Sequence, residues 1–259
     1  MKQKKSLGQN FLNSESIIRD IVAAGNIERS DVILEIGPGL GVLTRELLQT
    51  GAKVISVEKD DRLIPELQKM FMREITLKQF DLIHADILDL ELPHITKGNY
   101  KVIANIPYYI TGQVIRMFLE SDKQPLSMTL LVQKEVAERI VAKDGKESLL
   151  SLSVKAFGEP RYVRTVGRGA FTPQPNVDSA VLTIENISKN RLKDLDPNFF
   201  FAILHAGFAH KRKQLLPNLA SLYSKEKLLK AFDLCHIDHK ARAEDMSLNT
   251  WVKLCELLG

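Results

Sequence analysis

The sequence predicts an α/β fold, in which a doubly wound, mostly parallel β-sheet is followed by a small all-helical domain. Three observations support this prediction. Short runs of β-branched residues alternate with amphipathic stretches as far as Ile187, a glycine-rich loop follows the first strong strand, and only helical patterns remain after Ile187. Strand–helix alternation of this kind is typical of parallel sheets with helices on both faces.

The expected strands are short, rich in Val, Ile and Leu, and bounded by Gly, Asp, Asn or Pro, as strands buried on both faces are. In chain order they cover residues 32–36, 53–58, 81–85, 101–104 and 128–132. Two further strand-like runs follow at 152–156 and 179–184. The Gly- and Pro-rich stretch 158–175 between them is not expected to be regular throughout.

The amphipathic stretches between these strands predict helices. They cover residues 14–25, 42–50, 62–72, 112–120 and 134–143. Four more helical patterns come after Ile187, at 198–210, 211–222, 225–234 and 248–258, with Pro197 and Pro217 near helix starts or breaks. We therefore expect two domains, residues 1–187 and residues 188–259.

The composition is that of an ordinary globular protein. Of the 259 residues, 44% are hydrophobic and 26% are charged, which argues against a disordered chain, a collagen or a membrane bundle. No apolar run approaches the roughly 18 residues of a membrane span, and no apolar segment of a secretory signal follows the basic start of the chain. Cys235 and Cys255 are too few for a disulfide scaffold or a zinc cluster. We expect reduced thiols, no metal, and a soluble cytoplasmic protein.

The net charge of +4 neither requires nor excludes a nucleic-acid partner, because it is the small difference between 36 basic and 32 acidic residues. The cations gather in two clusters, and such clusters can bind phosphate. A solvated helix face is an equally good interpretation of each cluster taken alone. The clusters consist of Lys2, Lys4 and Lys5 at the start of the chain and of Lys211, Arg212 and Lys213 in the helical tail.

The clearest chemical motif is the loop Glu-Ile-Gly-Pro-Gly-Leu-Gly at residues 35–41, which follows a strand and opens a helix. Glycines there, such as Gly37 and Gly39, let the backbone approach a ligand at the helix N-terminus. The dinucleotide fingerprint would need glycine at position 42, where this chain has Val42. The pattern resembles instead the first motif of S-adenosylmethionine (SAM)-dependent methyltransferases. A plain strand–helix turn is the alternative.

Two acidic residues stand at the ends of the next two strands. Glu58 ends the second strand, and Asp86 comes just after the third. Carboxyl ends of parallel strands share one edge of the sheet, where such folds bind ligands. Glu58 can therefore accept the ribose hydroxyls of an adenosine, and Asp86 can accept from the adenine amino group. Solvated charges at strand ends are the alternative interpretation.

The segment Asn105-Ile106-Pro107-Tyr108 follows the fourth strand and resembles the motif of methyltransferases that modify an exocyclic amino nitrogen. The lone pair of such an amine is delocalised into the ring, so the amine is a poor nucleophile. Two carbonyl oxygens, on the Asn105 side chain and the Ile106 backbone, could accept its N–H bonds and aim the lone pair. Pro107 stiffens the turn, and Tyr108 would stack on the base. A plain Asn-x-Pro turn is the alternative.

A second aromatic candidate is Phe171, which precedes a rigid Pro-x-Pro segment. A ring held at low entropic cost could clamp the other face of the base. A buried core phenylalanine is an equally good interpretation.

Together these motifs resemble the KsgA-type rRNA adenine N6,N6-dimethyltransferases, and the resemblance covers nearly the whole chain. It includes Ser-Leu-Gly-Gln-Asn-Phe-Leu at 6–12, Gln-Lys-Glu-Val-Ala-Glu-Arg at 133–139, Phe-Thr-Pro-Gln-Pro-Asn-Val-Asp-Ser-Ala-Val at 171–181 and Phe-Ala-His-Lys-Arg-Lys-Gln-Leu at 208–215. Two departures are the segment 144–149, where the family often has a Lys-x-Tyr-Gly-like stretch, and His210, where Arg or Lys is commoner.

The resemblance implies a class I methyltransferase fold and the cofactor SAM. It implies a substrate of two adjacent adenines near the 3′ end of small-subunit rRNA, each methylated twice during ribosome biogenesis. We expect a monomer that acts on an assembling small subunit. The implied cofactor contacts are Asn10, Leu12, Gly37, Gly39, Glu58, Asp86 and Asn105. Tyr108 and Phe171 would sandwich the target adenine, and the basic tail would contact RNA.

Three alternatives stay open from the sequence. A 23S rRNA adenine methyltransferase of the erythromycin-resistance type shares the glycine loop and the Asn-Ile-Pro motif, but the Val-Asp-Ser-Ala-Val run and the basic tail favour the small-subunit enzyme. A DNA adenine methyltransferase would usually have a larger recognition region. A catalytically silent assembly factor predicts decay of the cofactor residues, and none is evident.

Overall fold

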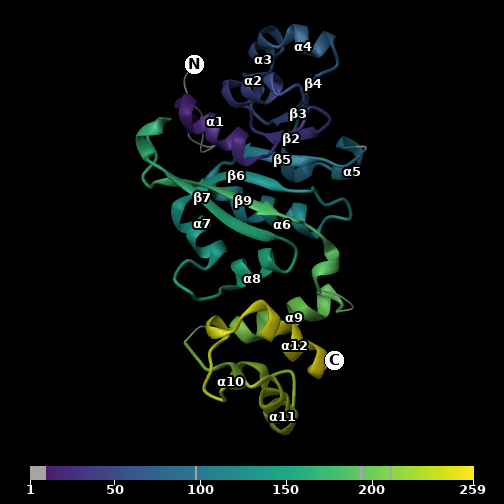
Figure 1. The fold of residues 1–259 in the computed structure, drawn as a ribbon, viewed down its shortest axis with the longest axis vertical. Coiled ribbons are helices and arrows are strands. Elements are labelled where there is room, and N and C mark those ends of the chain that lie inside the picture. The colour runs from purple at the N-terminus through teal and green to yellow at the C-terminus, as the bar shows by residue number, and fades with distance from the viewer. Residues whose placement is uncertain (1–9, 97, 193–194, 211) are drawn as a thin grey trace. The chain divides into compact units, whose positions relative to one another are not determined.

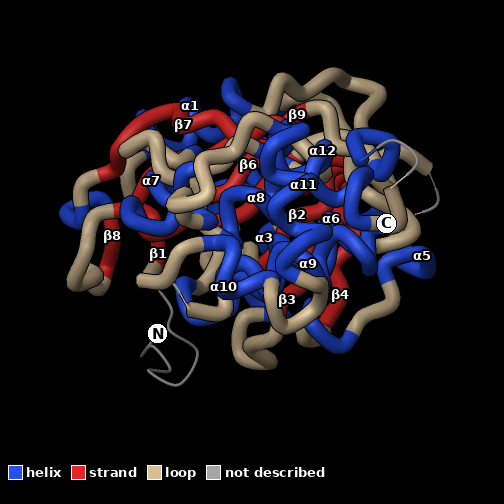
Figure 2. Tube along the Cα trace, turned by 90° about the horizontal axis from the view of Figure 1, so that it is seen from below, coloured by secondary structure: helices blue, strands red, loops and turns tan. Residues whose placement is uncertain are grey.

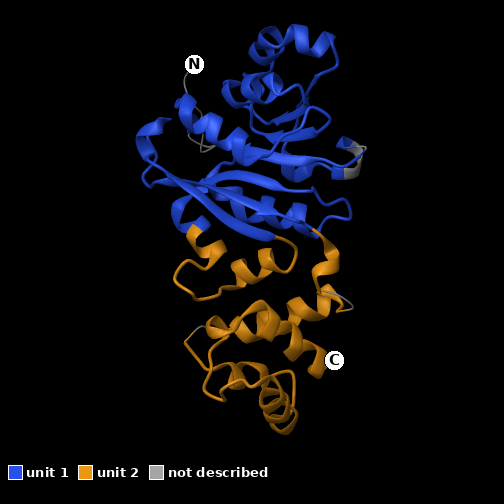
Figure 3. Cartoon of the chain, viewed as in Figure 1, with its two compact units in different colours: residues 1–137, 159–187 blue, residues 138–158, 188–259 orange. Residues whose placement is uncertain are grey.

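The computed structural model describes residues 10–96, 98–192, 195–210 and 212–259. The chain forms two compact units (Figure 3). Unit 1 comprises Met1–Ala137 and Glu159–Ile187, and unit 2 comprises Glu138–Gly158 and Ser188–Gly259. The expected domain boundary at residue 187 is the last point at which the chain passes from one unit to the other. The segment 138–158, which the sequence assigns to the first domain, packs with the C-terminal helices instead.

Unit 1 contains a seven-stranded sheet with the order β4-β3-β2-β5-β6-β9-β7 (Figure 1). The first five strands are parallel, β9 pairs antiparallel with β6, and β7 pairs antiparallel with β9. The strands are β2 Val32–Ile36, β3 Lys53–Glu58, β4 Phe80–His84, β5 Lys101–Asn105, β6 Met128–Gln133, β7 Glu159–Val166 and β9 Ser179–Glu185. The strand order reverses between β2 and β5, which is the place where open α/β sheets form their ligand crevice.

The strands β2, β3, β5, β6 and β9 are mostly buried because helices cover both faces of the sheet. Ile33, Ile103 and Leu131 belong to one core cluster, to which the helices α1 Glu15–Ala24, α2 Val42–Gln49 and α3 Ile64–Met70 also contribute. Side chains alternate along a strand, so the equally buried Leu34 and Val102 face the opposite side. The remaining helices that begin in unit 1 are α4 Met72–Thr76, α5 Leu92–Ile95, α6 Thr111–Glu120 and α7 Lys134–Val141.

A short antiparallel pair lies apart from the main sheet. It joins β1 Phe11–Leu12 to β8 Phe171–Thr172 (Figure 2). The pair brings the start of the described chain beside a segment about 160 positions later. No regular pattern in the sequence predicts this pairing, because each strand is only two residues long.

One expected strand is wrong. Residues 152–155 lie in the helix α8 Leu149–Lys155, and Ala156 is its C-cap. The alternation of Leu152 and Val154 with polar residues has a period of two, but Ser148 and Ser151 form a capping box that starts a helix. The strand β7 lies in the stretch 158–175, for which the sequence predicted only that the structure would not be regular throughout. Its exposed arginines and a register shift between Tyr162 and Arg164 interrupt the alternation of apolar and polar residues by which a strand is predicted.

Unit 2 is helical, as expected. It contains α8 together with α9 Pro197–Phe208, α10 Leu215–Leu219, α11 Lys225–Cys235 and α12 Leu248–Leu258. Trp251 is fully buried and stacks on Phe208. The helix expected over 211–222 is shorter in the structure, and Asn218 holds the preceding turn by donating to the Gly207 and His210 carbonyl oxygens. Among the described residues, no helix is both long and apolar enough to cross a membrane.

Candidate active site

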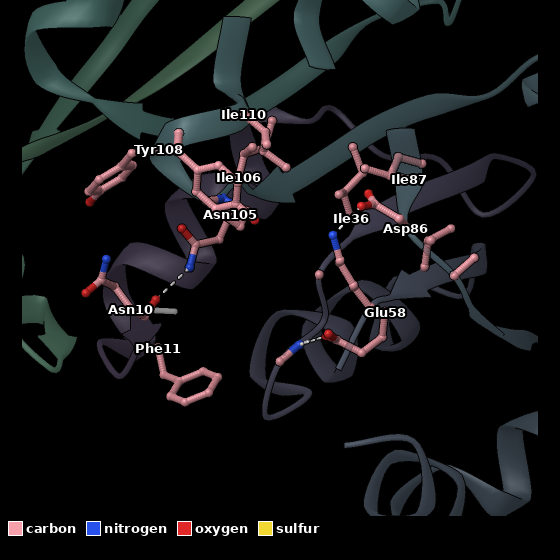
Figure 4. A pocket seen from close by; sticks show the side chains of 17 residues that line it. Asn10, Phe11, Ile36, Glu58, Asp86, Ile87, Asn105, Ile106, Tyr108 and Ile110 are labelled. Carbon is pink, nitrogen blue, oxygen red and sulfur yellow. Dashed lines mark hydrogen bonds and ion pairs between the residues drawn. The ribbon is translucent and has the colours of Figure 1, made fainter. Parts of the chain in front are cut away.

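A hollow of about 800 Å³, partly open to solvent, lies at the carboxyl ends of β2, β3, β4 and β5 (Figure 4). Most of the residues singled out from the sequence meet there. The predicted residues that line it are Asn10, Gly37, Gly39, Glu58, Asp86, Asn105, Ile106, Pro107 and Tyr108. Figure 4 shows Asn10, Asn105 and Tyr108 on one side and Glu58 and Asp86 on the other.

The glycine loop forms the floor between β2 and α2. Gly37, Gly39 and Gly41 all have positive φ angles, of 66°, 58° and 75°. Side chains are strained in this region of φ, ψ space. At Gly41 a Cβ atom would also lie 2.8 Å from the Phe71 ring, so no larger residue fits there. The alternating glycines therefore follow from the backbone path that brings main-chain atoms to the pocket.

Glu58 lies at the end of β3 and is only 5% exposed. One carboxylate oxygen accepts from the Gly39 N–H at 3.2 Å and the other from the Asp60 N–H at 2.8 Å. Burial raises the pKa of Glu58 above its usual value, against the opposing effect of these two hydrogen bonds. Each carboxylate oxygen has two lone pairs, so Glu58 keeps acceptor capacity toward the pocket while it also holds the glycine loop.

Asp86 follows β4 and caps a short 3₁₀ turn by accepting from the Leu88 N–H at 3.1 Å. It also forms an ion pair with Lys59. Burial acts to raise the pKa of Asp86, but the hydrogen bonds from Lys59 and Leu88 outweigh it and hold the pKa below its usual value. The carboxylate is therefore ionised at neutral pH and lies at the pocket wall as an acceptor.

Asn105 is the last residue of β5, opposite the two acids. Its side-chain nitrogen donates to the Asn10 backbone carbonyl at 3.2 Å. This bond uses the donor half of the amide, so the acceptor oxygen is the half available to an incoming N–H group. The next residue, Ile106, is buried and its N–H is held by the Leu131 carbonyl at 3.3 Å. The segment is thus anchored to Asn10, which directly precedes β1, and to β6.

Tyr108 is half-buried and its hydroxyl forms a 2.6 Å hydrogen bond with Ser179. Burial raises the pKa of the Tyr108 phenol, against the opposing effect of this hydrogen bond. The phenol is therefore neutral in the physiological range, and the ring is a neutral aromatic surface at the pocket wall.

Two predicted site residues do not line this hollow. Leu12 lines a smaller adjoining one, together with Phe11, Gly37 and Asn105. Phe171 is 4% exposed and belongs to the core of unit 1, where it pairs across the short sheet with Leu12. The Phe171 ring therefore lies in the core and is not among the residues that line the hollow.

The sequence did not predict eight of the residues that line the hollow, which are Phe11, Ile36, Val57, Lys59, Ala85, Ile87, Tyr109 and Ile110. All of them lie within two positions of a predicted residue, and this proximity in sequence was the one available signal. Tyr109 is 60% exposed and Lys59 is paired with Asp86. Their side-chain types, apolar, cationic and aromatic, carry no motif of their own.

Glu35 lies beneath the glycine loop and lines the smaller hollow. It is 1% exposed, and one carboxylate oxygen accepts from Thr44 at 2.7 Å and from Ser56 at 2.6 Å. The other oxygen is buried and has no hydrogen-bond partner. Burial raises the pKa of Glu35 to about 7, against the hydrogen bonds from Ser56 and Thr44.

The expected RNA-contacting cluster is described only in part. Arg212 and Lys213 are exposed on unit 2, whereas Lys211 and the basic start of the chain lie outside the described residues. In the ranges that the structure describes, no group of three or more His, Cys, Asp or Glu side chains could hold a metal ion.

The family model for ribosomal RNA adenine dimethylase matches residues 1–259. The chain is 44% identical to ribosomal RNA small subunit methyltransferase A of Dehalococcoides mccartyi (strain BAV1), over 98% of this chain and 88% of that protein. It is 39% identical to the protein of the same name from Fusobacterium nucleatum, over 99% of this chain and 97% of that protein.

Solved structures agree in fold. A dimethyladenosine transferase from Plasmodium falciparum superposes with a TM-score of 0.82 at 26% identity, over 94% of this chain and 95% of that one. The 23S rRNA methyltransferase ErmE superposes with a TM-score of 0.80 at 25% identity, over 96% and 99%. The expected class I methyltransferase fold with C-terminal helices is thereby confirmed. From its glycine loop to its helical tail, the chain belongs to the ribosomal RNA adenine dimethylase family.

Proposed function

We propose that this protein transfers methyl groups from SAM to N6 of two adjacent adenines near the 3′ end of small-subunit rRNA, twice on each base. One observation carries the proposal. The Asn105–Tyr108 segment, with its acceptor oxygens and aromatic ring, faces the carboxylates of Glu58 and Asp86 across one pocket. The residues proposed to bind the adenosine of SAM and those proposed to bind the target amine therefore line opposite sides of the same pocket.

The donors and acceptors of the pocket fit SAM. Glu58 would accept the ribose hydroxyls, and the Asp86 carboxylate would accept from the adenine amino group. Gly37 and Gly39 bring the backbone to the pocket without side chains, and Asn10, on the side opposite Glu58, would also contact the cofactor. When bound, SAM supplies an electrophilic methyl group on its sulfonium. The adjoining hollow lined by Leu12 continues the same site.

The protein's part in the reaction is to shape the attacking amine. The Asn105 side-chain oxygen and the Ile106 carbonyl would each accept one N–H bond of the target amino group. Two acceptors set apart in this way favour a tetrahedral nitrogen, whose lone pair is then localised and directed at the methyl group. No strong base is needed, since positioning supplies much of the lowering of the barrier.

The Tyr108 ring would stack on the target adenine once the base is unpaired or flipped out. Phe171 as a second clamp requires a rearrangement, because its ring is buried in the core of unit 1. We therefore assign the stacking contact to Tyr108 first and make the Phe171 role conditional on movement of the β1–β8 pair.

The substrate is proposed from the relatives that are named small-subunit methyltransferases. Arg212 and Lys213 are exposed cations of unit 2 and would bind rRNA phosphates. Lys211 would extend this cluster. We place the reaction in the cytoplasm, on an assembling small subunit, with a monomeric enzyme.

The proposal is tested with ribosomal subunits from cells that lack these dimethyl marks. Purified protein and SAM are incubated separately with small and large subunits, and nucleosides are analysed by mass spectrometry. Dimethyladenosine in the small-subunit RNA is expected. The same mark in large-subunit RNA alone would favour the activity of the structural neighbour ErmE, and no mark in either would favour a silent assembly factor.

A further inference from the structure

Ser179 has a buried hydroxyl group that has no role in the methyl transfer proposed for this protein. It is the first residue of β9 and is fully buried. Its hydroxyl lies 2.6 Å from the Tyr108 hydroxyl, across 71 positions of sequence. Because β9 runs antiparallel to β6, the first residue of β9 lies at the same sheet edge as the last residues of the parallel strands. The topology therefore brings a β9 hydroxyl into contact with Tyr108, a residue of the pocket wall.

The backbone of Ser179 is held on both sides. It pairs with Gln133 of β6 and with Val166 of β7. The preceding residue, Asp178, is held twice as well, since its carbonyl accepts from the Lys134 N–H at 3.0 Å and its carboxylate accepts from the Arg168 N–H at 3.0 Å. The hydroxyl of Ser179 therefore has a fixed position, on a strand that is paired on both sides.

The orientation of the Tyr108 side chain depends on a hydrogen-bond partner of fixed position. It belongs to a three-residue 3₁₀ turn, Tyr108–Ile110, rather than to a strand or a long helix. Its backbone is set by Pro107, but its ring still turns about two side-chain dihedrals. A base stacks well only on a ring of the right orientation. A hydrogen bond at the far end of the ring fixes where that end lies. Because a phenolic hydroxyl prefers hydrogen bonds in the plane of its ring, the bond also favours one tilt of the ring, and it leaves both ring faces uncovered.

We propose that Ser179 is a positioning residue, which holds the Tyr108 ring in the orientation that stacks on the target adenine. The inference rests on the proposed role of Tyr108 in base stacking. It explains the serine of the Val-Asp-Ser segment as part of the substrate side of the site. Asp178 fixes the loop and Ser179 fixes the ring.

The test is a double-mutant cycle on the full-length protein with Ser179→Ala, Tyr108→Phe and the double variant. Initial rates are measured with small ribosomal subunits that lack the dimethyl marks, and SAM affinity is measured by calorimetry. Each single variant is expected to lower kcat/KM for the subunits roughly 3- to 10-fold, the range of one lost hydrogen bond. The double variant is expected to be no worse than the poorer single variant, because both changes remove the same bond. The SAM dissociation constant should stay within about twofold of wild type.

Thr183→Val is the matched control. Thr183 is a buried hydroxyl on the same strand, but it donates to Glu185 instead of a pocket residue. This variant should keep wild-type kcat/KM. A double variant whose loss is the product of the two single losses would overturn the inference, and so would wild-type kcat/KM in Tyr108→Phe. The kcat/KM of Tyr108→Phe tests the inference even if the Ser179→Ala variant folds poorly.

Tyr108→Ala separates this inference from the proposed function. If the wild-type protein marks small-subunit RNA and Tyr108→Ala does so at the same rate, the stacking role of Tyr108 fails and the Ser179 inference fails with it. If Tyr108→Ala is inactive while Ser179→Ala and Tyr108→Phe keep wild-type kcat/KM, the stacking role stands and only the inference about Ser179 is overturned.

Discussion

Glu35 combines full burial with a carboxylate oxygen that has no hydrogen-bond partner. Burial of a carboxylate without full compensation is costly, and a raised pKa is the usual result. The pKa of Glu35 is about 7, whereas its ordinary value is 4.5. The folded protein therefore holds a proton on Glu35 over a pH range in which the unfolded chain has lost it.

This difference predicts how stability depends on pH. The folded state binds the extra proton, so the free energy of unfolding falls as pH rises from the ordinary value of 4.5 to about 7, and the loss is complete above that. The loss attributable to Glu35 is about 3 kcal/mol. Glu35→Gln removes the titration. Urea unfolding of both proteins at pH 5 and pH 8 checks this, because the variant should lose about 3 kcal/mol less than wild type between the two.

If the free energy of unfolding changes by the same amount between pH 5 and pH 8 in wild type and in Glu35→Gln, the pKa of Glu35 is not raised in the folded protein. The comparison does not depend on how well glutamine packs at position 35, since a packing cost is the same at both pH values. Other titrating groups act alike in both proteins and cancel.

Asn105 and Glu58 lie on opposite walls of the pocket, so substitutions of the two are expected to affect different steps, methyl transfer in one case and SAM binding in the other. Asn105→Ala removes an acceptor proposed to act on the target amine, so methylation of small-subunit RNA should be abolished while the SAM dissociation constant changes little. Glu58→Ala removes the proposed ribose acceptor and should raise that dissociation constant at least roughly tenfold, the cost of losing hydrogen bonds to a charged group. Methyl incorporation and calorimetry measure the two effects.

Asp81→Asn is the control for this pair, because Asp81 is a partly exposed acid of β4 that pairs with Lys53 away from the pocket. It should leave both quantities near wild type. Normal methylation by Asn105→Ala would remove its role in positioning the amine, and an unchanged dissociation constant in Glu58→Ala would remove the ribose contact.

At the level of elements, α8 shows how a local hydrogen bond decides between helix and strand. The Ser151 N–H donates to the Ser148 hydroxyl at 3.1 Å, and the Ser148 N–H donates to the Ser151 hydroxyl at 2.7 Å. Two N–H groups that a helix start leaves unpaired are thereby satisfied. A strand could not form these two reciprocal hydrogen bonds. The segment is therefore a helix, although its apolar residues alternate as they would in a strand.

Ser148→Ala should therefore lower the free energy of unfolding by about 1 kcal/mol, the usual cost of losing an N-cap. Ser153→Ala is the matched control in the same helix. The Ser153 hydroxyl donates to the Leu149 carbonyl, which the helix already uses, and alanine is the better helix former. Urea denaturation of both variants checks the prediction, and equal effects of the two substitutions would show that the cap contributes nothing.

At the scale of the whole molecule, each unit has a core of its own. Trp251 is the only tryptophan of the sequence and lies at the centre of unit 2. It packs directly on Gly207 of α9, where an added Cβ would stand 2.4 Å from the indole ring. Its fluorescence therefore reports on the packing of unit 2 specifically.

Gly207→Ala should destabilise unit 2 by about 1–3 kcal/mol, because the indole or the helix must shift to admit the methyl group. Urea unfolding followed by Trp251 fluorescence measures this. Gly112→Ala, in α6 of unit 1, is the control, since its Cβ would have no neighbour within 4 Å. A Gly207→Ala midpoint equal to wild type would show that the indole moves freely.

Much of the site could be predicted because its residues are tied to local patterns. Gly37, Glu58, Asp86 and Asn105 each lie at or just after the carboxyl end of a short apolar run, and parallel strands bring those ends to one edge of the sheet. The order of the motifs along the chain then predicts the pocket without any distance being known. The structure places all four on its wall.

Residues whose position depends on distant pairing could not be predicted in this way. Phe171 lies in the core because the two-residue strand β8 pairs with β1, and no periodicity can appear in two residues. The contact of Ser179 with Tyr108 depends on β9 entering the sheet antiparallel beside β6. The segment 138–158 belongs to unit 2 through contacts with residues that come later in the chain.

By itself, the sequence determined the alternation of strands and helices, the glycine loop, and the acids and the amide at strand ends, because these depend on local periodicity and on residue chemistry. Only the tertiary structure decided which aromatic ring faces the pocket, which hydroxyl orients it, and which segment joins the helical unit. These features depend on strand register and on side-chain burial, and both are properties of long-range packing that no local window of sequence contains.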